Sequence, residues 1–584
     1  MFPLFPCFAA ILLFAQTNNA QPNPNIWTAG LEISYDSYSN WAQSINNTQP
    51  FLVVYPRTSQ QVASVVTWAY TVGRNVRIQG HRHSYPPITV SRMDDPSKIL
   101  LIDLTRHMTK LRIGSRAGGT GTGQRLNNGG RLNTVVAETG ATMDALFRFS
   151  EENNLGLVMA PIIGQDATIG GVLAIGGHGA GIPALNEKLQ GPGYTFGSVS
   201  NTILEFKAIV WNNRTNRYLV QTFTRSNPDT AAFIVHVGRA IITEVTLMVG
   251  PNYNYRCVSY TNIPGRELFA HPANSRGLRT FTSFMDDVGR VDVIWYPFVQ
   301  SPWLKIWSVE ENKPRNSTFI DEPYPYQFDS TFLNPQTPGT VFGPLSLERL
   351  ERGLTQDNRW DIWGRSKNTI LHYNRTTTPL SYSGYVVLTN RANVQLVLHE
   401  ISEFYLKLLD EYGARGIYPI DNYIKLRVTG LDDPRETGVN GAVGPLISPT
   451  SPMPSRPDFD SGVWMNTLTT TGRPYSDEFM RKMEDFAYLR FNGNDAIVRP
   501  EWSKNWGHSD AAPFGNQYFL KNTIPQVFGV QEWNRAIAIL DKYDPHQVIS
   551  NSFLRELMVP YGGRGPLAIT QGTSIQVAGF GWNK

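Results

Sequence analysis

A run of small residues between Gly170 and Gly181 is the feature that most constrains how this chain can fold. Six of its twelve residues are glycine, and Ala174 and Ala180 add two more small side chains. Bare backbone amides in such a run can approach a bulky ligand closely and donate hydrogen bonds to its anionic groups. We therefore expect this segment to form a cradle in which a large cofactor lies against the backbone.

A short loop earlier in the chain complements this cradle. Residues 76–79 alternate between apolar and polar side chains, which predicts a strand, and Gly80 then allows a tight turn or a close approach to a ligand. His81 and His83 follow, but a metal site would need further ligands, and the neighbouring sequence holds no cluster of cysteine or histidine. Two solvated histidines would be the simplest interpretation of this loop alone. The glycine-rich run favours instead a cofactor site that both segments share.

The chain is long enough for several packed cores. It has 584 residues, of which 41% are hydrophobic and 12% aromatic, so more than one domain is expected. The net charge of +4 is small for this length, and no basic run accompanies it. A nucleic-acid partner is therefore not expected.

The amino-terminal segment 1–20 predicts a secretory signal peptide. Its apolar run is too short to cross a bilayer, and no later stretch has membrane-spanning character. Cys7 lies in this segment, so Cys257 is alone in the mature chain and no intrachain disulfide is expected. Four glycosylation sequons also fit a secreted glycoprotein. They begin at Asn46, Asn213, Asn316 and Asn374.

Hydrophobic periodicity outlines the elements around these segments. It predicts a capped helix from Thr58, a hairpin over 203–222, neighbouring strands at 291–296 and 303–307, and a long amphipathic helix after Asn393. Residues 335–344 and 432–457 are expected to be loops, and the length of the second suggests a lid or a disordered excursion.

Together these segments resemble the vanillyl-alcohol-oxidase family of FAD-linked oxidases over most of the mature chain. The likeness is carried by Pro56-Arg57-Thr58, by the loop Gly80–Ser84, by Thr168–Gly179 and by the strand at 240–243. It implies an α+β fold with a two-part FAD-binding domain of the PCMH (p-cresol methylhydroxylase) type, discontinuous in sequence, and an inserted substrate domain of antiparallel sheet and helices. The expected boundaries are 48–255 for the FAD-binding domain, 256–490 for the substrate-binding domain and 491–584 for a segment that returns to the FAD domain.

The resemblance also implies where FAD binds. His83 takes the place of the histidine that is commonly bonded covalently to the flavin, and His81 is the alternative tether. His178 is expected to pack against backbone rather than to act as a base, and no metal is expected. The other expected cofactor-binding residues lie in the loop, the glycine-rich run and a later strand: Gly80, His81, Arg82, Ser84, Thr168, Gly170, Gly171, Gly176, Gly179 and Ile242.

Within the family the sequence is most similar to the covalent-flavin (type II) cholesterol oxidases. The likeness is carried by the motifs at 303–307, 426–431, 499–504 and 543–546. It implies that Arg427 lies over the flavin at the active site and that Asn466 lines an oxygen-access tunnel. Glu267 takes the place of a glutamate that helps to order the site, with Asp292 as the alternative. The context of Glu267 also fits a surface helix start.

Two departures from the family pattern bear on the substrate. Lys425 stands where the sterol oxidases have a glutamate near the active-site arginine, and a lysine repels an arginine unless an anion intervenes. The segment 501–504 is similar to the His-Trp-Ala-Lys of aldonolactone oxidases, but it differs at Glu501 and Ser503.

These residues suggest a division of chemical roles. In FAD enzymes the cofactor carries the hydride chemistry, while the protein orients the substrate and manages one proton. Arg427 can stabilise an alcohol that moves toward alkoxide, but its pKa is too high for it to accept a proton. A buried carboxylate such as Glu267 would be the better base.

The leading hypothesis is a secreted FAD-dependent oxidase that converts a secondary alcohol, such as the sterol cholesterol, to a ketone while O2 is reduced to H2O2. The first alternative keeps the fold and changes the substrate to a sugar, an aldonolactone or another polar alcohol. A second is a non-catalytic secreted binding protein on a flavoprotein scaffold. The expected partners are a small-molecule alcohol and O2, with no transmembrane segment and a monomeric or small oligomeric state.

Overall fold

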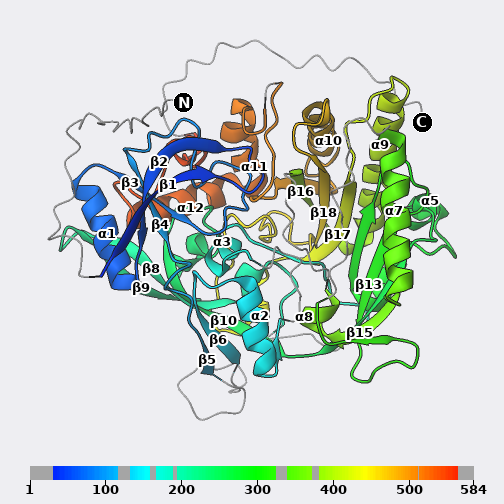
Figure 1. Ribbon diagram of the computed structural model, residues 1–584, viewed down its shortest axis with the longest axis horizontal. Helices are drawn as coiled ribbons and strands as arrows, with labels where there is room; N and C mark the ends of the chain where they lie inside the picture. Colours follow the sequence, from blue (N-terminus) through cyan, green and yellow to red (C-terminus); the bar gives the residue numbers. More distant parts are fainter. Residues whose placement is uncertain are drawn as a thin grey trace, which may run out of the picture.

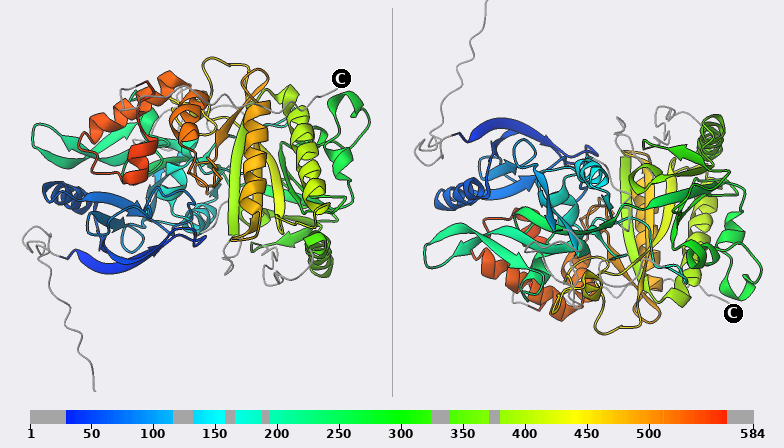
Figure 2. Two further views of the ribbon diagram at one scale, coloured as in Figure 1. Left: turned by 90° about the horizontal axis from the view of Figure 1, so that it is seen from above. Right: turned by 90° about the horizontal axis from the view of Figure 1, so that it is seen from below.

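The computed structural model describes residues 30–115, 132–157, 166–187, 194–323, 339–370, 380–510 and 512–562. They form two lobes that lie side by side and are built on three β-sheets (Figure 1, Figure 2). The expected signal peptide and the sequon at Asn374 lie outside the described residues. In the part of the chain that is described, every helix is too short or too polar to span a lipid bilayer.

The first sheet delivers the histidine loop. Its order is β1 (Glu32–Ser39), β2 (Asn46–Tyr55), β4 (Ile99–Asp103) and β3 (Asn75–Gln79). Strands β2, β4 and β3 are parallel because helix α1 (Ser59–Thr71) carries the chain back between β2 and β3. The side chain of Thr58 caps α1, as the sequence predicts. Because β3 ends at Gln79, the loop from Gly80 emerges at the carboxyl edge of the parallel strands, where open sheets usually bind ligands.

The second sheet supports the glycine-rich run. Its order is β5 (Leu111–Ser115), β6 (Asn133–Glu138), β10 (Ile242–Pro251), β8 (Ile203–Asn212) and β9 (Arg217–Thr224), with β7 (Leu155–Gly156) beside β10. The predicted hairpin is confirmed as β8 and β9. The run itself begins as a short helix, α3 (Ile169–Ala174), and turns at Gly176, whose φ of 67° lies in the left-handed region that favours glycine. Helix α2 (Met143–Glu152) precedes it.

The third sheet forms the second lobe. Among the described residues its order is β14 (Thr318–Ile320), β15 (Asp361–Arg365), β11 (Asn254–Tyr260), β13 (Trp303–Val309), β12 (Arg290–Trp295), β17 (Tyr423–Gly430), β18 (Ser461–Thr470), β16 (Leu380–Thr389) and β19 (Ala496–Pro500). The predicted pairing of β12 with β13 is confirmed. Seen from the first lobe, the predicted long helix α9 (Val394–Gly413) lies beyond these strands (Figure 2). Helix α10 (Ser476–Arg490) packs beside α9 through Phe404 and Phe486, whose rings stack 4.1 Å apart.

Two of the remaining helices in the described part of the chain are long, with 18 and 14 residues, and the others are short. Helix α7 (Gly339–Gln356) lies at the outer end of the second lobe (Figure 1). The second long helix is α12 (Val530–Tyr543), and the short ones are α4 (Thr230–Phe233), α5 (Gly265–Leu268), α6 (Phe281–Val288), α8 (Ser366–Thr369), α11 (Ile524–Phe528) and α13 (Ser552–Leu557).

The carboxyl-terminal part of the chain joins both lobes. Strand β19 pairs with β16 at the edge of the third sheet, and the chain then returns to the first lobe as α11, α12 and α13. After α12, a buried ion pair of 2.8 Å joins Asp544 to Arg239, and the amide of Val76 in β3 donates to the carbonyl of Val548. Breaking a buried ion pair of this kind typically costs about 3–5 kcal/mol, so this contact holds the carboxyl-terminal segment firmly against the first lobe.

One loop expectation is wrong, and a second is right only in part. Helix α7 begins at Gly339, inside the segment 335–344, and contains Pro344; residues 335–338 lie outside the described part. A Cβ on Gly343 would lie 1.7 Å from the carbonyl oxygen of Pro297, so tertiary packing uses this glycine for a close contact rather than for a turn. The segment 432–457 is largely a loop, as expected, with one short 3-10 turn at Pro434–Thr437, but it is neither a lid nor a disordered excursion, because its residues from Leu446 to Ser451 are buried.

Candidate active site

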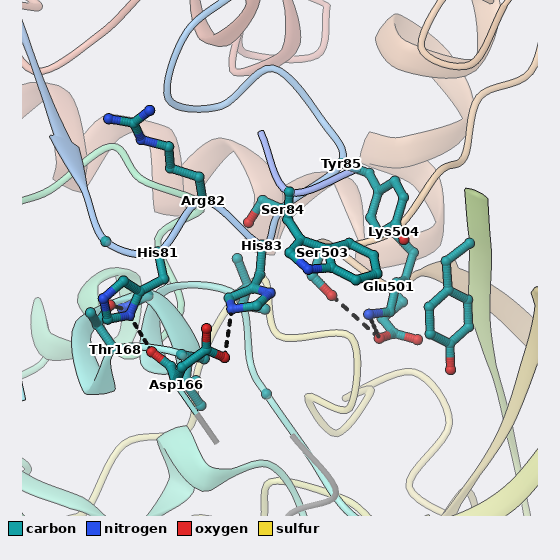
Figure 3. Close-up of a pocket in the computed structure, with 18 of the residues that line it drawn as sticks. His81, Arg82, His83, Ser84, Tyr85, Asp166, Thr168, Glu501, Ser503 and Lys504 are labelled. Atoms are coloured by element: carbon teal, nitrogen blue, oxygen red, sulfur yellow. Dashed lines mark hydrogen bonds and ion pairs between the residues drawn. The ribbon is translucent and has the colours of Figure 1, made fainter. Parts of the chain in front are cut away.

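A cavity of about 370 Å³ lies between the two lobes. The loop at 80–85 and the glycine-rich run line one side, and strands β16, β17 and β18 contribute residues to the other. Three segments that are far apart in sequence therefore meet at one site: the loop after β3, the start of α3, and the segment 501–504 after β19 (Figure 3).

At one end of the cavity, His83 and His81 both turn toward Asp166 (Figure 3). Nε2 of His83 lies 2.9 Å from Oδ1 of Asp166, and Nδ1 of His81 contacts the backbone carbonyl of the same residue. The hydrogen bond with His83 is the main cause of the lowered pKa of Asp166. Arg82, which has a φ of 61°, points its guanidinium away to the ring of Tyr38 at 4.9 Å. Among the described residues no group of three or more His, Cys, Asp or Glu side chains could hold a metal ion.

The residues at this end fit a flavin cofactor. A Cβ on Gly80 would lie 2.5 Å from Oγ1 of Thr168, so the loop approaches the start of α3 as closely as only glycine allows. Thr168 in turn accepts a hydrogen bond from the amide of Gly171. The result is an open wall of backbone and small side chains beside the two histidines, which suits a flat ring system and its phosphates.

Most of the expected cofactor-binding residues line this cavity, and two do not. The residues that line it are Gly80, His81, Arg82, His83, Ser84, Thr168, Gly170, Gly171 and Ile242. Gly176 instead packs against Pro449 and Ser448, and Gly179 supplies a carbonyl near the ring of His178. The glycine-rich run thus lines the cavity from Gly170 as far as His178, while Gly176 and Gly179 within it face elsewhere. Two lining residues that the sequence analysis missed are Trp41 and His236.

Further along the cavity, a buried set of polar groups surrounds Glu501. Its Oε2 accepts a hydrogen bond of 2.6 Å from Nδ2 of Asn466, whose Oδ1 accepts one of 3.2 Å from Arg427. Its Oε1 lies 3.7 Å from Nε2 of His178 and 3.8 Å from Nζ of Lys504. Arg427 and Glu501 line the cavity, whereas Asn466 stands behind them and connects the two.

Neighbouring groups keep Glu501 ionised. Burial by itself would raise the pKa of Glu501, but Lys504, His178 and Arg427 outweigh this effect and hold the pKa below its ordinary value of 4.5. Burial, together with the nearby charge of Arg427, lowers the pKa of His178 to about 4, so this imidazole is neutral at pH 7. Its ring also stacks on Trp464 with centroids 3.3 Å apart and lines the cavity.

A glycine makes room for this arrangement. Gly384 in β16 lies opposite Asn466 in β18. A Cβ on Gly384 would lie 2.5 Å from Nδ2 of Asn466 and 2.7 Å from Oε2 of Glu501. Any side chain here would therefore push apart the two groups that hydrogen-bond beside it.

Asp292 is the anion that allows Lys425 to stand near Arg427. In β12 it pairs with Arg427 of β17 and with Lys305 of β13. Its carboxylate lies 2.6 Å from Nζ of Lys305 and 3.4 Å from Nζ of Lys425. All three charged groups are buried, and burial lowers the pKa of both lysines. The repulsion expected between Lys425 and Arg427 is thus relieved by an aspartate on the neighbouring strand.

Glu267 is the one expected catalytic residue that the structure places away from the cavity. It lies in α5, where both of its carboxylate oxygens accept hydrogen bonds of 2.8 Å from Arg279. The expectation of a base at this position is therefore corrected, and Glu501 is the buried carboxylate that lines the cavity. The only sequence signal for Glu501 is its departure from the aldonolactone-oxidase motif.

Beyond the charged groups the lining of the cavity is mostly apolar and aromatic, although Ser346, Arg349, Asp421 and Asn422 also line it. Helix α7 contributes several lining residues, and strands of the third sheet contribute the rest. The apolar and aromatic lining residues in this part are Tyr296, Phe342, Leu345, Leu380, Tyr423 and Leu468. A bulky apolar molecule with one polar group would match this division, with the polar group beside Glu501 and Arg427.

Two family models match the chain. One, described as an FAD binding domain, matches residues 50–185, and the other, described as cholesterol oxidase, substrate-binding, matches residues 254–559. The second match spans more than half of the chain. The chain belongs to the cholesterol oxidase family. As a member of this family it is an FAD-dependent alcohol oxidase, and the α+β fold class expected from the sequence is confirmed.

Solved structures agree with this assignment. A solvent-stable cholesterol oxidase is 36% identical with a TM-score of 0.85, covering 93% of this chain and 100% of that chain. The cholesterol oxidase of B. sterolicum is 32% identical with a TM-score of 0.85, covering 93% and 99%. Berberine bridge enzyme from Eschscholzia californica shares the fold alone, at 12% identity and a TM-score of 0.51 over 88% and 90%. Among curated proteins, none matches the sequence.

Replacing Asp292 with asparagine should lower the free energy of unfolding by about 3–5 kcal/mol, because two buried lysines lose the anion that they share. Urea denaturation followed by fluorescence measures this loss. Adding Lys425→Met to Asp292→Asn should recover part of it, with a coupling energy of at least about 1 kcal/mol. Strictly additive effects of the two substitutions would contradict the assignment of Asp292 as the partner of Lys425.

Proposed function

We propose that this protein oxidises the secondary alcohol of a sterol such as cholesterol to a ketone, with O2 as the electron acceptor and H2O2 as the second product. The observation that carries the proposal is a cavity in which the buried residues Glu501 and Arg427, joined through Asn466, face a mostly apolar and aromatic part of the lining. The similarity to cholesterol oxidases over nearly the whole chain supports the same substrate class.

In this proposal the protein orients the alcohol and handles its proton. FAD, when bound, supplies the acceptor for the hydride. Arg427 stabilises negative charge on the substrate oxygen and on the reduced cofactor. Glu501 accepts the hydrogen bond of the hydroxyl and then takes its proton. Its low pKa does not prevent this step, because a hydroxyl whose carbon is losing a hydride becomes strongly acidic.

Apolar walls should set the substrate preference. We expect H2O2 production from the purified protein with 3-hydroxysterols, and a kcat/KM at least 100-fold lower with sugars and aldonolactones of similar hydroxyl geometry, because these leave their other hydroxyls unpaired in the apolar part. A coupled peroxidase assay on both panels measures this ratio. A preference for the polar panel would favour the alternative of a polar-alcohol oxidase, and no turnover of either panel would favour the binding protein.

Glu501→Gln should slow reduction of the bound flavin by sterol about 10²- to 10⁴-fold, the range typical of a removed proton acceptor. Stopped-flow absorbance of the flavin measures this step without involving oxygen. Glu348→Gln is the matched control, since Glu348 is an exposed residue of α7. In the unmodified protein Glu501 should stay ionised at every pH above its ordinary pKa of 4.5, because its pKa is lowered, so its protonation should slow flavin reduction only at a pH well below 4.5.

We further propose that FAD is attached covalently through His83. The support is that His83 lines the cavity beside backbone that fits a flavin. Intact mass measurement should find one FAD bonded to the unmodified protein and none bonded to His83→Ala. His81→Ala should retain the bond. If the adduct persists in His83→Ala and maps to His81, the alternative tether is the correct one.

Secretion and glycosylation are also proposed. The predicted signal at 1–20 and the exposed side chains of Asn46, Asn213 and Asn316 support this. Expression in a eukaryotic secretory host should yield the protein in the medium, and glycosidase treatment should increase its gel mobility. Retention inside the cell without a mobility change would argue against both.

A further inference from the structure

Asp166 makes two contacts with the histidine loop that the alcohol-oxidation chemistry does not use. Its carboxylate lies 2.9 Å from Nε2 of His83, and its backbone carbonyl contacts Nδ1 of His81 (Figure 3). The loop is held from the other side as well, because the amide of Trp41 donates a hydrogen bond of 2.8 Å to the carbonyl of Arg82. One residue next to α3 thus fixes the ring of His83 by its side chain and the neighbouring ring by its backbone.

We propose that Asp166 is a catalytic residue for the covalent attachment of the flavin to His83. This inference rests on the attachment proposed above. The carboxylate holds the N–H of His83 at Nε2, which leaves the lone pair on Nδ1 as the nucleophile and fixes the tautomer of the ring. As Nδ1 forms its new bond, the proton on Nε2 passes to Asp166.

The atoms and electrons balance with dioxygen as the oxidant. The new bond joins Nδ1 of His83 to a methyl carbon on the benzene ring of the flavin, and one C–H bond of that methyl group breaks. The carbon and the imidazole each give up a proton, and the electron pair of the broken bond reduces the flavin. Dioxygen then takes the electron pair and the two protons to form H2O2, which leaves an oxidised flavin bonded to the protein.

The exposure and the ionisation state of Asp166 suit a proton acceptor. Its side chain is 37% exposed and that of His83 is 31% exposed, so both are open to the cavity in which a flavin would lie. The hydrogen bond with His83 and the nearby ring of His81 lower the pKa of Asp166, so it is an ionised acceptor at neutral pH. Thr168, two residues further on, caps α3 and keeps this part of the chain in place.

The test is a time course of attachment in the full-length protein. Apoprotein from riboflavin-limited cells is mixed with FAD in air, and covalent flavin is followed by fluorescence on denaturing gels and by intact mass. Non-covalent binding is measured separately by ultrafiltration before attachment proceeds. We expect Asp166→Asn to bind FAD within about twofold of the unmodified protein but to attach it at least tenfold more slowly. The matched control is Asp144→Asn, which removes an aspartate of α2 that pairs with Arg148, outside the cavity.

The outcomes separate the two proposals. If the unmodified protein never forms the bond, the attachment proposed above is wrong. If it does so and Asp166→Asn keeps the normal rate, only the role of Asp166 is wrong. Loss of FAD binding in Asp166→Asn would show a structural role and would also overturn the inference. Partial recovery of the rate in Asp166→Glu supports it.

The linkage gives a second readout. Proteolysis of the holoprotein releases a histidyl-flavin that chromatography can compare with synthetic isomers bonded at Nδ1 and at Nε2. The contact between Nε2 and Asp166 requires the Nδ1 isomer, and recovery of the Nε2 isomer would overturn the proposal.

Discussion

The buried carboxylate of Glu501 is the interaction on which the rest of the site depends. An ionised group without partners would be too costly to bury, so the fold must bring Lys504, Arg427 and Asn466 to it. Meeting this requirement fixes how β16, β17, β18 and the segment after β19 come together. Gly384 leaves the space that this arrangement needs, since any larger residue would push Asn466 and Glu501 apart.

The buried charges form two layers, one around Glu501 and one around Asp292. Asp292 neutralises Lys305 and Lys425 within three neighbouring strands, and Arg427 belongs to both layers because it pairs in register with Asp292 and donates to Asn466. Lys425, at a position where the family resemblance implies a glutamate, is therefore compatible with this fold. The carboxylate of Asp292 balances the charge of Lys425, which offsets its repulsion of Arg427.

The sequence analysis succeeded where a residue's role depends on its own neighbourhood. The strand, turn and histidines of the loop at 80–85, and the hairpin of β8 and β9, are all local patterns, and the structure has them as expected. It failed where a long-range contact decides the role. From sequence alone, either Glu267 or Glu501 could be the active-site carboxylate. Only the fold buries Glu501 in the cavity wall and pairs Glu267, in α5, with Arg279.

By itself the sequence determined the family, the FAD-binding class and the two segments that line one side of the cavity, because these follow from short motifs of glycine, histidine and strand-forming residues. Only the tertiary structure decided which carboxylate lines the cavity, which aspartate contacts His83, and which anion balances Lys425. Each of these pairs residues that are far apart in the chain. The strength of these interactions depends on the distance between the charged groups, and only the folded backbone brings the groups within a few ångströms of each other.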